Sequence, residues 1–408
     1  MNRREWLAGA VASGAVASVA AAKGADASPA RASALPGKAD FPLAERRTYL
    51  NNAGYHPMSV QAARAVQDYL ERRTDGTKEP DWEVSARVRE DFAAIVNARP
   101  FEVGYVTSTM AGENLVVASL GLGRGGGNVV TDALHFEGSL YLYGSLKSRG
   151  VDVRVVRPRE WRIDLRDLDR AIDRDTKLVA VSLVSFLNGF QHDLKAVSDL
   201  AHARGAYVYA DIIQAAGAIP IDLAAAGVDF AACASYKWLM GDFGLGFLYV
   251  REDLLERLPR VQYGWRQFED FEYHMLPGDP PGEFPATWRQ REGTPGHFDL
   301  GMFSRTTEAC LAHSLPLIRR IGPATIQAHA QSMTTRLQKE LPGLGYEPLT
   351  PAESRSPIVA CVVKDPEAVR AKLARARVEV KIEQHYMRVS PSLYNDQGDV
   401  DRLLNALS

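Results

Sequence analysis

The sequence predicts an α/β fold with a largely parallel sheet, followed by a smaller α+β unit. Three observations support this prediction. From Asn128 onward, short β-rich runs alternate with segments of helical period. Most of the β-rich runs are apolar at both odd and even positions. After about Gly301 the pattern changes to long helical periods and then to short strands. Strands that are apolar on both sides indicate a sheet covered by helices on both faces.

Six apolar runs are expected to form strands of the large sheet. The clearest helix between them covers residues 194–204, and the proline- and glycine-rich residues 277–285 are expected to form a surface loop. The C-terminal unit is expected to end in a helix from Val400. The six predicted strands are residues 128–133, 151–156, 177–185, 206–211, 229–235 and 244–250, and those of the smaller unit are 356–364 and 378–384.

The glycine-rich residues 121–127 contain the spacing G-x-G-x-x-G. A dinucleotide-binding fingerprint must follow a strand and open a helix. Here the glycines follow a predicted helix at residues 113–120 and precede a predicted strand. We therefore expect a tight turn rather than a nucleotide site.

Charge and cysteine content exclude several classes of protein. The chain has 48 basic and 50 acidic residues with the two signs mixed, so no nucleic-acid or anionic membrane surface is predicted. Its three cysteines have no C-x-x-C spacing and its nine histidines show no paired spacing. Neither a disulfide framework nor a metal site is therefore expected.

The first 34 residues have the layout of an export signal. Arg3 and Arg4 precede a short run rich in alanine, which is too short and too polar to span a bilayer stably. The string at residues 2–7, NRREWL, resembles a twin-arginine signal, with Trp6 where phenylalanine is usual. We expect the twin-arginine machinery to export the folded protein to the periplasm. The alternative is an N-terminal extension that stays attached.

Chemically informative residues concentrate between residues 206 and 250. One predicted strand ends at Asp211, with Gln214 three residues later, and another ends just before the Ser-Tyr-Lys run at 235–237. Ligands of open α/β sheets bind at the carboxyl ends of strands. A buried lysine there would have a lowered pKa, which suits Schiff-base formation. An acid on the neighbouring strand could keep a pyridine nitrogen protonated.

This stretch resembles the core of the class V family of pyridoxal-phosphate enzymes, which includes cysteine desulfurases, isopenicillin N epimerase, kynureninase and several aminotransferases. The resemblance covers about residues 49–406. It implies fold type I: a large domain with a mainly parallel seven-stranded sheet, a smaller α+β C-terminal domain, and a pyridoxal 5'-phosphate cofactor. The expected parts are a signal peptide (1–34), an N-terminal segment that packs with the small domain (35–60), the large cofactor-binding domain (61–300) and the small domain (301–408).

The resemblance also implies roles around the cofactor ring. Lys237 would bind the cofactor through a Schiff base and then act as the base. Asp211 would pair with the ring nitrogen, and Gln214 would hydrogen-bond the phenolic oxygen. His135 is favoured as the residue stacked on the ring, although alignment with kynureninase would choose Phe136.

Other positions match the family's phosphate and substrate contacts. Thr109 occupies the threonine position of the phosphate-binding turn, whereas Met110 stands where a second threonine is common. Ser235 and Tyr236 take the cofactor-binding positions before the lysine. Thr294 matches a threonine that reaches the phosphate of the partner subunit, which implies a homodimer with shared active sites. Arg388 would clamp the carboxylate of the substrate.

The departures from the family pattern bear on the reaction. Desulfurases carry a mobile cysteine in the segment before the arginine, and this chain has none there. Cys361 and Cys233 lie in apolar runs and are expected to be buried. Phe186 stands where the family usually has a polar residue that touches substrate or cofactor, so Asn188 is a candidate for that role. Gln214 replaces the histidine of kynureninase, which argues against that activity.

These features predict an exported enzyme that acts at the α-carbon or amino group of an amino-acid or peptide-derived small molecule, of the aminotransferase or epimerase type. Two alternatives remain at this point. One is a lyase that breaks a C–S or C–C bond, similar to desulfurases or kynureninase. The other is a non-catalytic descendant that binds a ligand.

Overall fold

The computed structural model describes residues 35–76 and 82–408. The predicted signal peptide, residues 1–34, lies outside the described residues. Within the described part, none of the helices has the length and apolar character that crossing a membrane requires.

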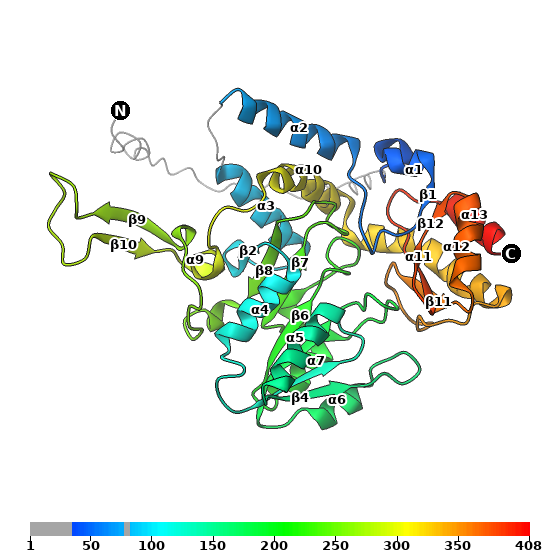
Figure 1. Cartoon of the computed structure of the whole chain (residues 1–408), viewed down its shortest axis with the longest axis horizontal. Helices are drawn as coiled ribbons and strands as arrows, with labels where there is room; N and C mark the ends of the chain where they lie inside the picture. Colours follow the sequence, from blue (N-terminus) through cyan, green and yellow to red (C-terminus); the bar gives the residue numbers. More distant parts are fainter. Residues whose placement is uncertain (1–34, 77–81) are drawn as a thin grey trace, which may run out of the picture. The chain divides into compact units, whose positions relative to one another are not determined.

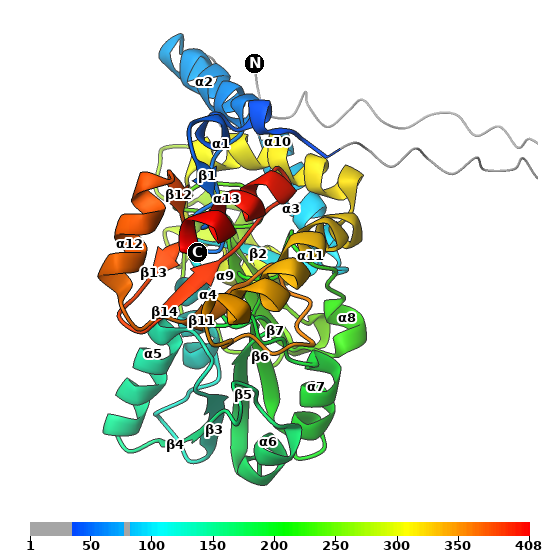
Figure 2. The ribbon, with the colours of Figure 1, turned by 90° about the vertical axis from the view of Figure 1, so that its right-hand side faces the viewer.

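A seven-stranded sheet forms the centre of the structure, in the order β2-β8-β7-β6-β5-β3-β4 (Figures 1 and 2). The neighbours from β7 to β4 are parallel, whereas β8 is antiparallel to both β2 and β7. All six predicted strands are present, and the fold class is confirmed. The additional strand, β2, is four residues long. The strands are β2 (Val103–Val106), β3 (Asn128–Asp132), β4 (Asp152–Val156), β5 (Thr176–Ser182), β6 (Tyr207–Asp211), β7 (Phe230–Ala234) and β8 (Gly246–Val250).

Helices cover both faces of this sheet, as the apolar strands predict. In β5, Leu178 and Ala180 pack in a cluster with α4 and α5, whereas Val179 and Val181 pack on the other face with α3, α7 and α10. Each buried valine or leucine side chain among these stabilises the fold by roughly 1.5–3 kcal/mol. The helices are α3 (Trp82–Ile95), α4 (Thr109–Ser119), α5 (Glu137–Ser148), α7 (Leu194–His202) and α10 (Arg305–Ile321).

Shorter or peripheral helices complete the part of the chain around the large sheet. The predicted helix at 194–204 corresponds to α7, and the predicted glycine turn joins α4 to β3. Gly121, Gly123 and Gly127 of that turn have φ of 64°, 88° and 109°, a conformation that favours glycine. The remaining helices are α1 (Pro42–Arg46), α2 (Val60–Thr74), α6 (Leu165–Ala171), α8 (Leu223–Ala226) and α9 (Gly293–Phe298).

A two-stranded hairpin follows the large sheet. β9 (Phe268–Tyr273) and β10 (Ala286–Gln290) are antiparallel, and the hairpin extends away from the sheet (Figure 1). The predicted loop at residues 277–285 lies between the two strands, so that prediction is confirmed. The strands themselves are not expected from the sequence.

The C-terminal residues form a second, three-stranded antiparallel sheet in the order β11-β14-β13. One face of this sheet packs with α11, α12 and α13 in a separate apolar cluster. The predicted strand at 378–384 is divided between β12 and β13, because β12 pairs instead with β1 in a parallel two-stranded sheet. The elements are α11 (Pro323–Glu340), β11 (Val359–Val362), α12 (Pro366–Arg375), β12 (Val378–Glu379), β13 (Lys381–Ile382), β14 (Tyr386–Val389), α13 (Gln397–Leu407) and β1 (Thr48–Tyr49).

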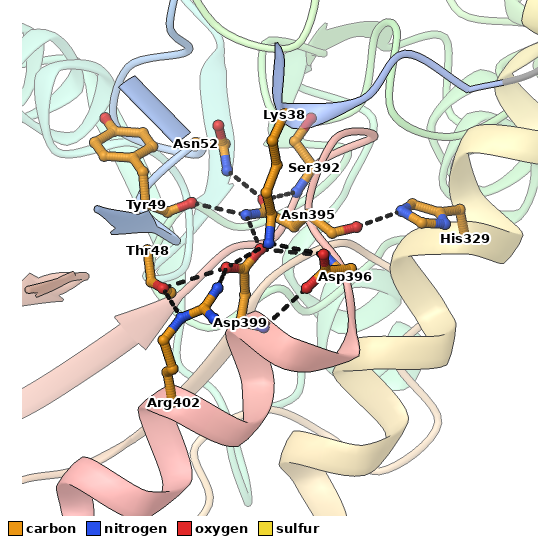
Figure 3. Close-up of polar contacts among 10 residues, drawn as sticks. All are labelled: Lys38, Thr48, Tyr49, Asn52, His329, Ser392, Asn395, Asp396, Asp399 and Arg402. Atoms are coloured by element: carbon orange, nitrogen blue, oxygen red, sulfur yellow. Dashed lines mark hydrogen bonds and ion pairs between the residues drawn. The ribbon is translucent and has the colours of Figure 1, made fainter. Parts of the chain in front are cut away.

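The N-terminal segment lies against these C-terminal elements (Figure 2). A polar network around Asp399 holds it there (Figure 3). The buried Asp399 carboxylate accepts hydrogen bonds from Lys38 Nζ at 3.0 Å, Thr48 Oγ1 at 3.2 Å and Asn395 Nδ2 at 3.0 Å, and it also pairs with Arg402. Burial alone would raise the pKa of Asp399, but these hydrogen bonds and the charge of Lys38 hold it below its usual value.

Candidate active site

A cavity lies where β5, β6 and β7 end at their carboxyl edge and α4 begins. It brings together residues from segments spread over more than a hundred positions of the chain. Its lining residues are Ser108, Thr109, Met110, Phe136, Ser182, Phe186, Asp211, Ile213, Gln214, Ala234, Tyr236 and Lys237. Most of the residues that the sequence singles out therefore meet in one place.

Lys237 and Asp211 supply the two ionisable groups of the cavity. Burial lowers the pKa of Lys237 to about 8, with the charge of Asp211 opposing this shift and that of Arg388 adding to it. Burial raises the pKa of Asp211 to about 6, with the charge of His135 opposing the shift. Near neutral pH a useful fraction of the lysine is thus the neutral, nucleophilic amine.

The N-terminus of α4 faces the cavity. Ser108 caps this helix, because its side chain accepts a hydrogen bond from the amide of Ala111 at 3.1 Å. Thr109 Oγ1 accepts a hydrogen bond from the Ala234 amide at 2.9 Å, which joins the start of α4 to the end of β7. The amides at a helix N-terminus favour an anion such as a phosphate. Met110 adds an apolar side chain to the lining where the family often has a hydroxyl.

Two aromatic rings form a wall of the cavity. Phe136 and Phe186 meet edge to face, with ring centroids 5.5 Å apart. His135, which the sequence analysis favours for stacking, does not line the cavity. Its ring is buried, with Nδ1 at 2.8 Å from Ser182 Oγ and Nε2 at 3.2 Å from Glu113 Oε1. The structure thus corrects the preference for His135, since Phe136 is the residue that points to the cavity.

Gln214 and Tyr236 line the cavity as expected, whereas Ser235 does not. The Gln214 amide is fixed at both ends: its Nε2 donates to Ala53 O at 3.0 Å and its Oε1 accepts from Trp238 Nε1 at 2.9 Å. One N–H of this amide is left for a ligand. The Ser235 hydroxyl lies 2.7 Å from the carbonyl oxygens of residues 242 and 245, so it serves the following turn and not the cavity.

Arg388 is placed by β14, is almost completely buried, and is not among the residues that line the cavity. Its Nη1 donates to the carbonyl of Phe186 at 2.7 Å, and its buried Nε has no hydrogen-bond partner among the described residues. A buried guanidinium N–H without a partner is costly, which fits a site made to receive a carboxylate.

Asn188, the other candidate for a substrate contact, is fully committed to the protein. Its Nδ2 donates to Trp161 O at 2.9 Å and to Leu349 O at 3.0 Å, and its Oδ1 accepts from the Phe190 amide at 3.1 Å. It does not line the cavity. The structure therefore corrects its expected role: Asn188 joins distant loops instead of replacing the polar residue lost at Phe186.

Thr294 lies on α9 with 0% of its surface exposed, and its side chain approaches Gly104 of β2 in the same chain. Its hydroxyl has no hydrogen-bond partner among the described residues. The expected contact of Thr294 with the partner's cofactor, and the homodimer that this contact implies, stay predictions.

The sequence analysis missed Ser182, Ser108 and Glu113. Ser182 ends β5 directly beside Asp211, which is its register partner on β6. Glu113 is a single acid within the apolar helix α4 and is wholly buried. An acid at an apolar helix position is the signal that could have singled it out. Within the described residues no group of three or more histidine, cysteine, aspartate or glutamate side chains is arranged to hold a metal ion.

The donor set of the cavity fits pyridoxal phosphate. Lys237 offers an amine of lowered pKa for the aldehyde, and Asp211 offers a carboxyl for the ring nitrogen. The N-terminus of α4 suits the phosphate, and Phe136 offers a ring face. Outside this lining, the buried Nε of Arg388 has no hydrogen-bond partner among the described residues.

Comparison with known proteins leads to the same cofactor. Residues 49–403 match the aminotransferase class-V family. The chain is 29% identical over 308 residues, 74% of each chain, to a protein named probable cysteine desulfurase from Methanothermobacter thermautotrophicus. The apo structure of cysteine desulfurase from Thermococcus onnurineus matches with a TM-score of 0.78 and 22% identity, over 91% of this chain and 96% of that one.

A further solved structure shows the cofactor itself. It is a lysine-to-alanine variant of C-DES with glycine covalently linked to pyridoxal phosphate, and it matches with a TM-score of 0.78 and 20% identity over 91% of this chain and 99% of that one. The extent of the family match and the agreement in fold lead to one assignment. The chain belongs to the aminotransferase class-V family and is a pyridoxal-phosphate-dependent enzyme of fold type I.

Proposed function

We propose that this enzyme acts at the α-carbon or amino group of an amino-acid or peptide-derived substrate, as an aminotransferase or an epimerase. The observation that carries this proposal is the burial of all three thiols: Cys233 and Cys361 are 1% exposed and Cys310 is 0% exposed. Burial raises the pKa of each thiol. A thiol must be ionised and accessible to accept sulfur from a substrate. Cysteine desulfuration through a persulfide on this chain is therefore disfavoured.

The residues of the cavity support chemistry at the α-carbon. The Arg388 guanidinium would hold the substrate carboxylate and so orient the bonds of the α-carbon. Lys237 Nζ would remove the α-proton and hold it for return. When bound, pyridoxal phosphate supplies an electron sink for the charge that this proton removal creates. The rings of Phe136 and Phe186 would exclude water from this side of the cavity.

Products separate this proposal from its alternatives. Purified enzyme is incubated with amino acids and short peptides in deuterated water and the products are analysed by mass spectrometry. Deuterium exchange at the α-carbon with inversion supports epimerisation, and accumulation of pyridoxamine phosphate supports transamination. Release of sulfide, or of a shortened carbon skeleton, would instead establish a lyase. The similarity to proteins named cysteine desulfurases supports this alternative. A lyase that releases sulfur directly from the substrate needs no cysteine on the enzyme.

The second alternative is a protein that binds without catalysis. Pyridoxal phosphate bound through Lys237 gives an absorbance band that a Lys237→Ala variant lacks. A colourless protein that stays colourless with added pyridoxal phosphate would contradict an enzymatic role. A protein with the band, but with no exchange or turnover on any substrate tested, would support the non-catalytic alternative.

We also propose that the enzyme is exported through the twin-arginine pathway and works as a homodimer in the periplasm. The arginine pair at residues 3 and 4 supports export. Cell fractionation and N-terminal sequencing test it, since a periplasmic chain that starts after the signal is expected. An intact N-terminus in the cytoplasm would contradict it.

Light scattering measures the oligomeric state, and a monomer at micromolar concentration would contradict the homodimer.

A further inference from the structure

Beneath the cavity lies a buried group of polar side chains that the chemistry proposed above does not use. Its centre is Glu113 of α4. The carboxylate accepts hydrogen bonds from Ser139 Oγ at 2.6 Å and Tyr143 OH at 2.8 Å, and its Oε1 lies 3.2 Å from His135 Nε2. Ser139 and Tyr143 belong to α5, so the group joins α4 to α5.

Glu113 needs a positive partner. Glu113 is 0% exposed, and a carboxylate is buried at high cost unless it is paired and hydrogen-bonded. Its hydrogen-bond partners Ser139 and Tyr143 are neutral, and His135 is the basic group among its described contacts. A doubly protonated imidazole would satisfy both of its own contacts, because Nε2–H would donate to Glu113 and Nδ1–H to Ser182 Oγ.

From His135 the group continues to the cavity. Ser182 Oγ lies 2.8 Å from Nδ1 of the histidine, and Ser182 lines the cavity and lies opposite Asp211 in the register of β5 and β6. If Nδ1–H of the histidine donates to Ser182 Oγ, the hydroxyl hydrogen of Ser182 remains free to donate to another group. With His135 doubly protonated and both acids ionised, the charges from α4 to the cavity would alternate: negative at Glu113, positive at His135 and negative at Asp211.

We propose that Glu113 keeps His135 positively charged and that this charge holds Asp211 ionised, so that Asp211 can keep the ring nitrogen of the bound cofactor protonated. Glu113 is thus a positioning residue that acts through His135. The inference depends on the pyridoxal phosphate cofactor and on the pairing of its ring nitrogen with Asp211, and not on which reaction follows.

The electrostatics agree with this arrangement. Burial alone would lower the pKa of His135, but the charge and hydrogen bond of Glu113, with the charges of Asp211 and Asp132, raise it overall. The charge of His135 in turn lowers the pKa of Asp211 against the effect of burial. The titratable groups that face His135 or Asp211 are Glu113 on α4, Tyr143 on α5, Asp132 on β3, Tyr209 on β6, Cys233 on β7, and Tyr236 and Lys237 after β7.

Two variants separate charge from hydrogen bonding. Glu113→Gln removes the negative charge and keeps a side chain of the same shape. Tyr143→Phe is the matched control, because it removes a hydrogen bond to Glu113 and leaves every charge in place. Both variants are loaded with pyridoxal phosphate labelled with ¹⁵N at the ring nitrogen, and the nitrogen chemical shift is followed from pH 6 to 10. This measurement reports protonation of the ring and requires no turnover.

In the wild type and in Tyr143→Phe, the ring nitrogen is expected to stay protonated over most of this range. In Glu113→Gln its proton affinity is expected to fall about tenfold, the change that one pKa unit represents. An unchanged titration in Glu113→Gln would overturn the proposal. An equal shift in Tyr143→Phe would also overturn it, because the effect would then not depend on the charge of Glu113.

A second measurement keeps the proposal testable if Glu113→Gln does not fold. In wild-type protein labelled with ¹⁵N-histidine and free of cofactor, the two ring nitrogens of His135 report its protonation state at pH 8. The signal is assigned with a His135→Gln variant. A doubly protonated imidazole is the expected result, and a neutral imidazole at pH 8 would overturn the proposal whatever reaction the enzyme catalyses.

Discussion

At the scale of single residues, burial sets the chemistry of Lys237. The lysine follows β7 and is 7% exposed, and this desolvation lowers the pKa of its amine to about 8. The charge of Asp211 opposes the shift and the charge of Arg388 adds to it. The amine attacks an aldehyde only in its neutral form. Its reactivity is therefore tuned by groups on two separate sheets.

The pH dependence of cofactor binding follows from this arrangement. The rate at which cofactor-free protein binds pyridoxal phosphate is expected to rise with pH, with a midpoint near 8, because the neutral amine increases as the proton leaves. Arg388→Met is expected to move the midpoint upward, since the Arg388 charge disfavours protonated Lys237. Stopped-flow absorbance measures the rate. Arg166→Met, at an exposed ion pair with Asp164, is the control and should keep the midpoint.

An unchanged midpoint in Arg388→Met would contradict this account of the shift.

The position of Phe136, rather than His135, in the cavity wall gives a second prediction at this scale. Phe136→Leu is expected to weaken pyridoxal phosphate binding by about fivefold, because an aromatic contact contributes roughly 0.5–1.5 kcal/mol beyond burial. Phe190→Leu is the control, since Phe190 packs against His192 outside the cavity. Equilibrium titration of the cofactor absorbance gives both dissociation constants. Equal constants for wild type and Phe136→Leu would show that the ring face is supplied elsewhere.

At the scale of elements, the strands and the ends of strands could be predicted from the sequence. β5, β6 and β7 are short and apolar on both sides, and their ends place Ser182, Asp211 and Lys237 at one edge of the sheet. Local periodicity determines these features. The hairpin β9–β10 escaped prediction because most of its residues are exposed, so no alternation of buried and exposed positions marks its strands.

Other site residues could not be placed from local sequence, because distant segments decide their contacts. Asn188 donates hydrogen bonds to the carbonyls of residues 161 and 349, and the Ser235 hydroxyl lies within hydrogen-bond distance of the carbonyls of residues 242 and 245. His135 and Phe136 are neighbours in the turn between β3 and α5, so a shift of the turn by one residue would exchange their positions. The contact of His135 with the distant Glu113 accompanies the arrangement in which Phe136 lines the cavity.

The attachment of the N-terminal segment to α13 gives a prediction about elements. Asp399 has a lowered pKa in the folded protein, so its contribution to stability is full above its unfolded pKa and is lost as the pH falls through the folded value. Asp399→Asn is expected to cost about 2 kcal/mol at pH 7. The cost should shrink as the pH falls through the folded-state pKa of Asp399, which lies below its ordinary value, because the wild-type carboxyl then also becomes neutral. Chemical denaturation at pH 7 and at successively more acidic pH values measures this trend.

Asp401→Asn is the matched control on the same helix. Asp401 pairs with Arg336 on the exposed side of α13, where its side chain is 53% exposed. Exposed ion pairs contribute little, so its loss should cost under about 1 kcal/mol. A cost for Asp399→Asn that is equal to that of Asp401→Asn, or that does not depend on pH, would contradict the role given to Asp399.

At the scale of the whole molecule, residues 52–56 connect the two sheets at the active site. Ala53 donates its amide to Ser390 Oγ at 3.0 Å, next to β14, and its carbonyl accepts from Gln214 in the cavity at 3.0 Å. The amide of His56 donates to the carbonyl of Tyr236 at 3.2 Å, beside Lys237. The sheet that carries Arg388 and the loops that carry Gln214 and Lys237 are thus held to one another through the N-terminal segment.

This connection predicts how the chain responds to shortening. A chain that begins at residue 35 is expected to bind pyridoxal phosphate as well as the full chain does, because the cavity contacts named above lie within residues 35–76 and 82–408. A chain that begins at residue 60 is expected to lose cofactor binding, since Gln214 and Tyr236 lose their contacts with Ala53 and His56. Cofactor absorbance tests both chains. Undiminished cofactor binding by the shorter chain would show that the large sheet organises the site without this segment.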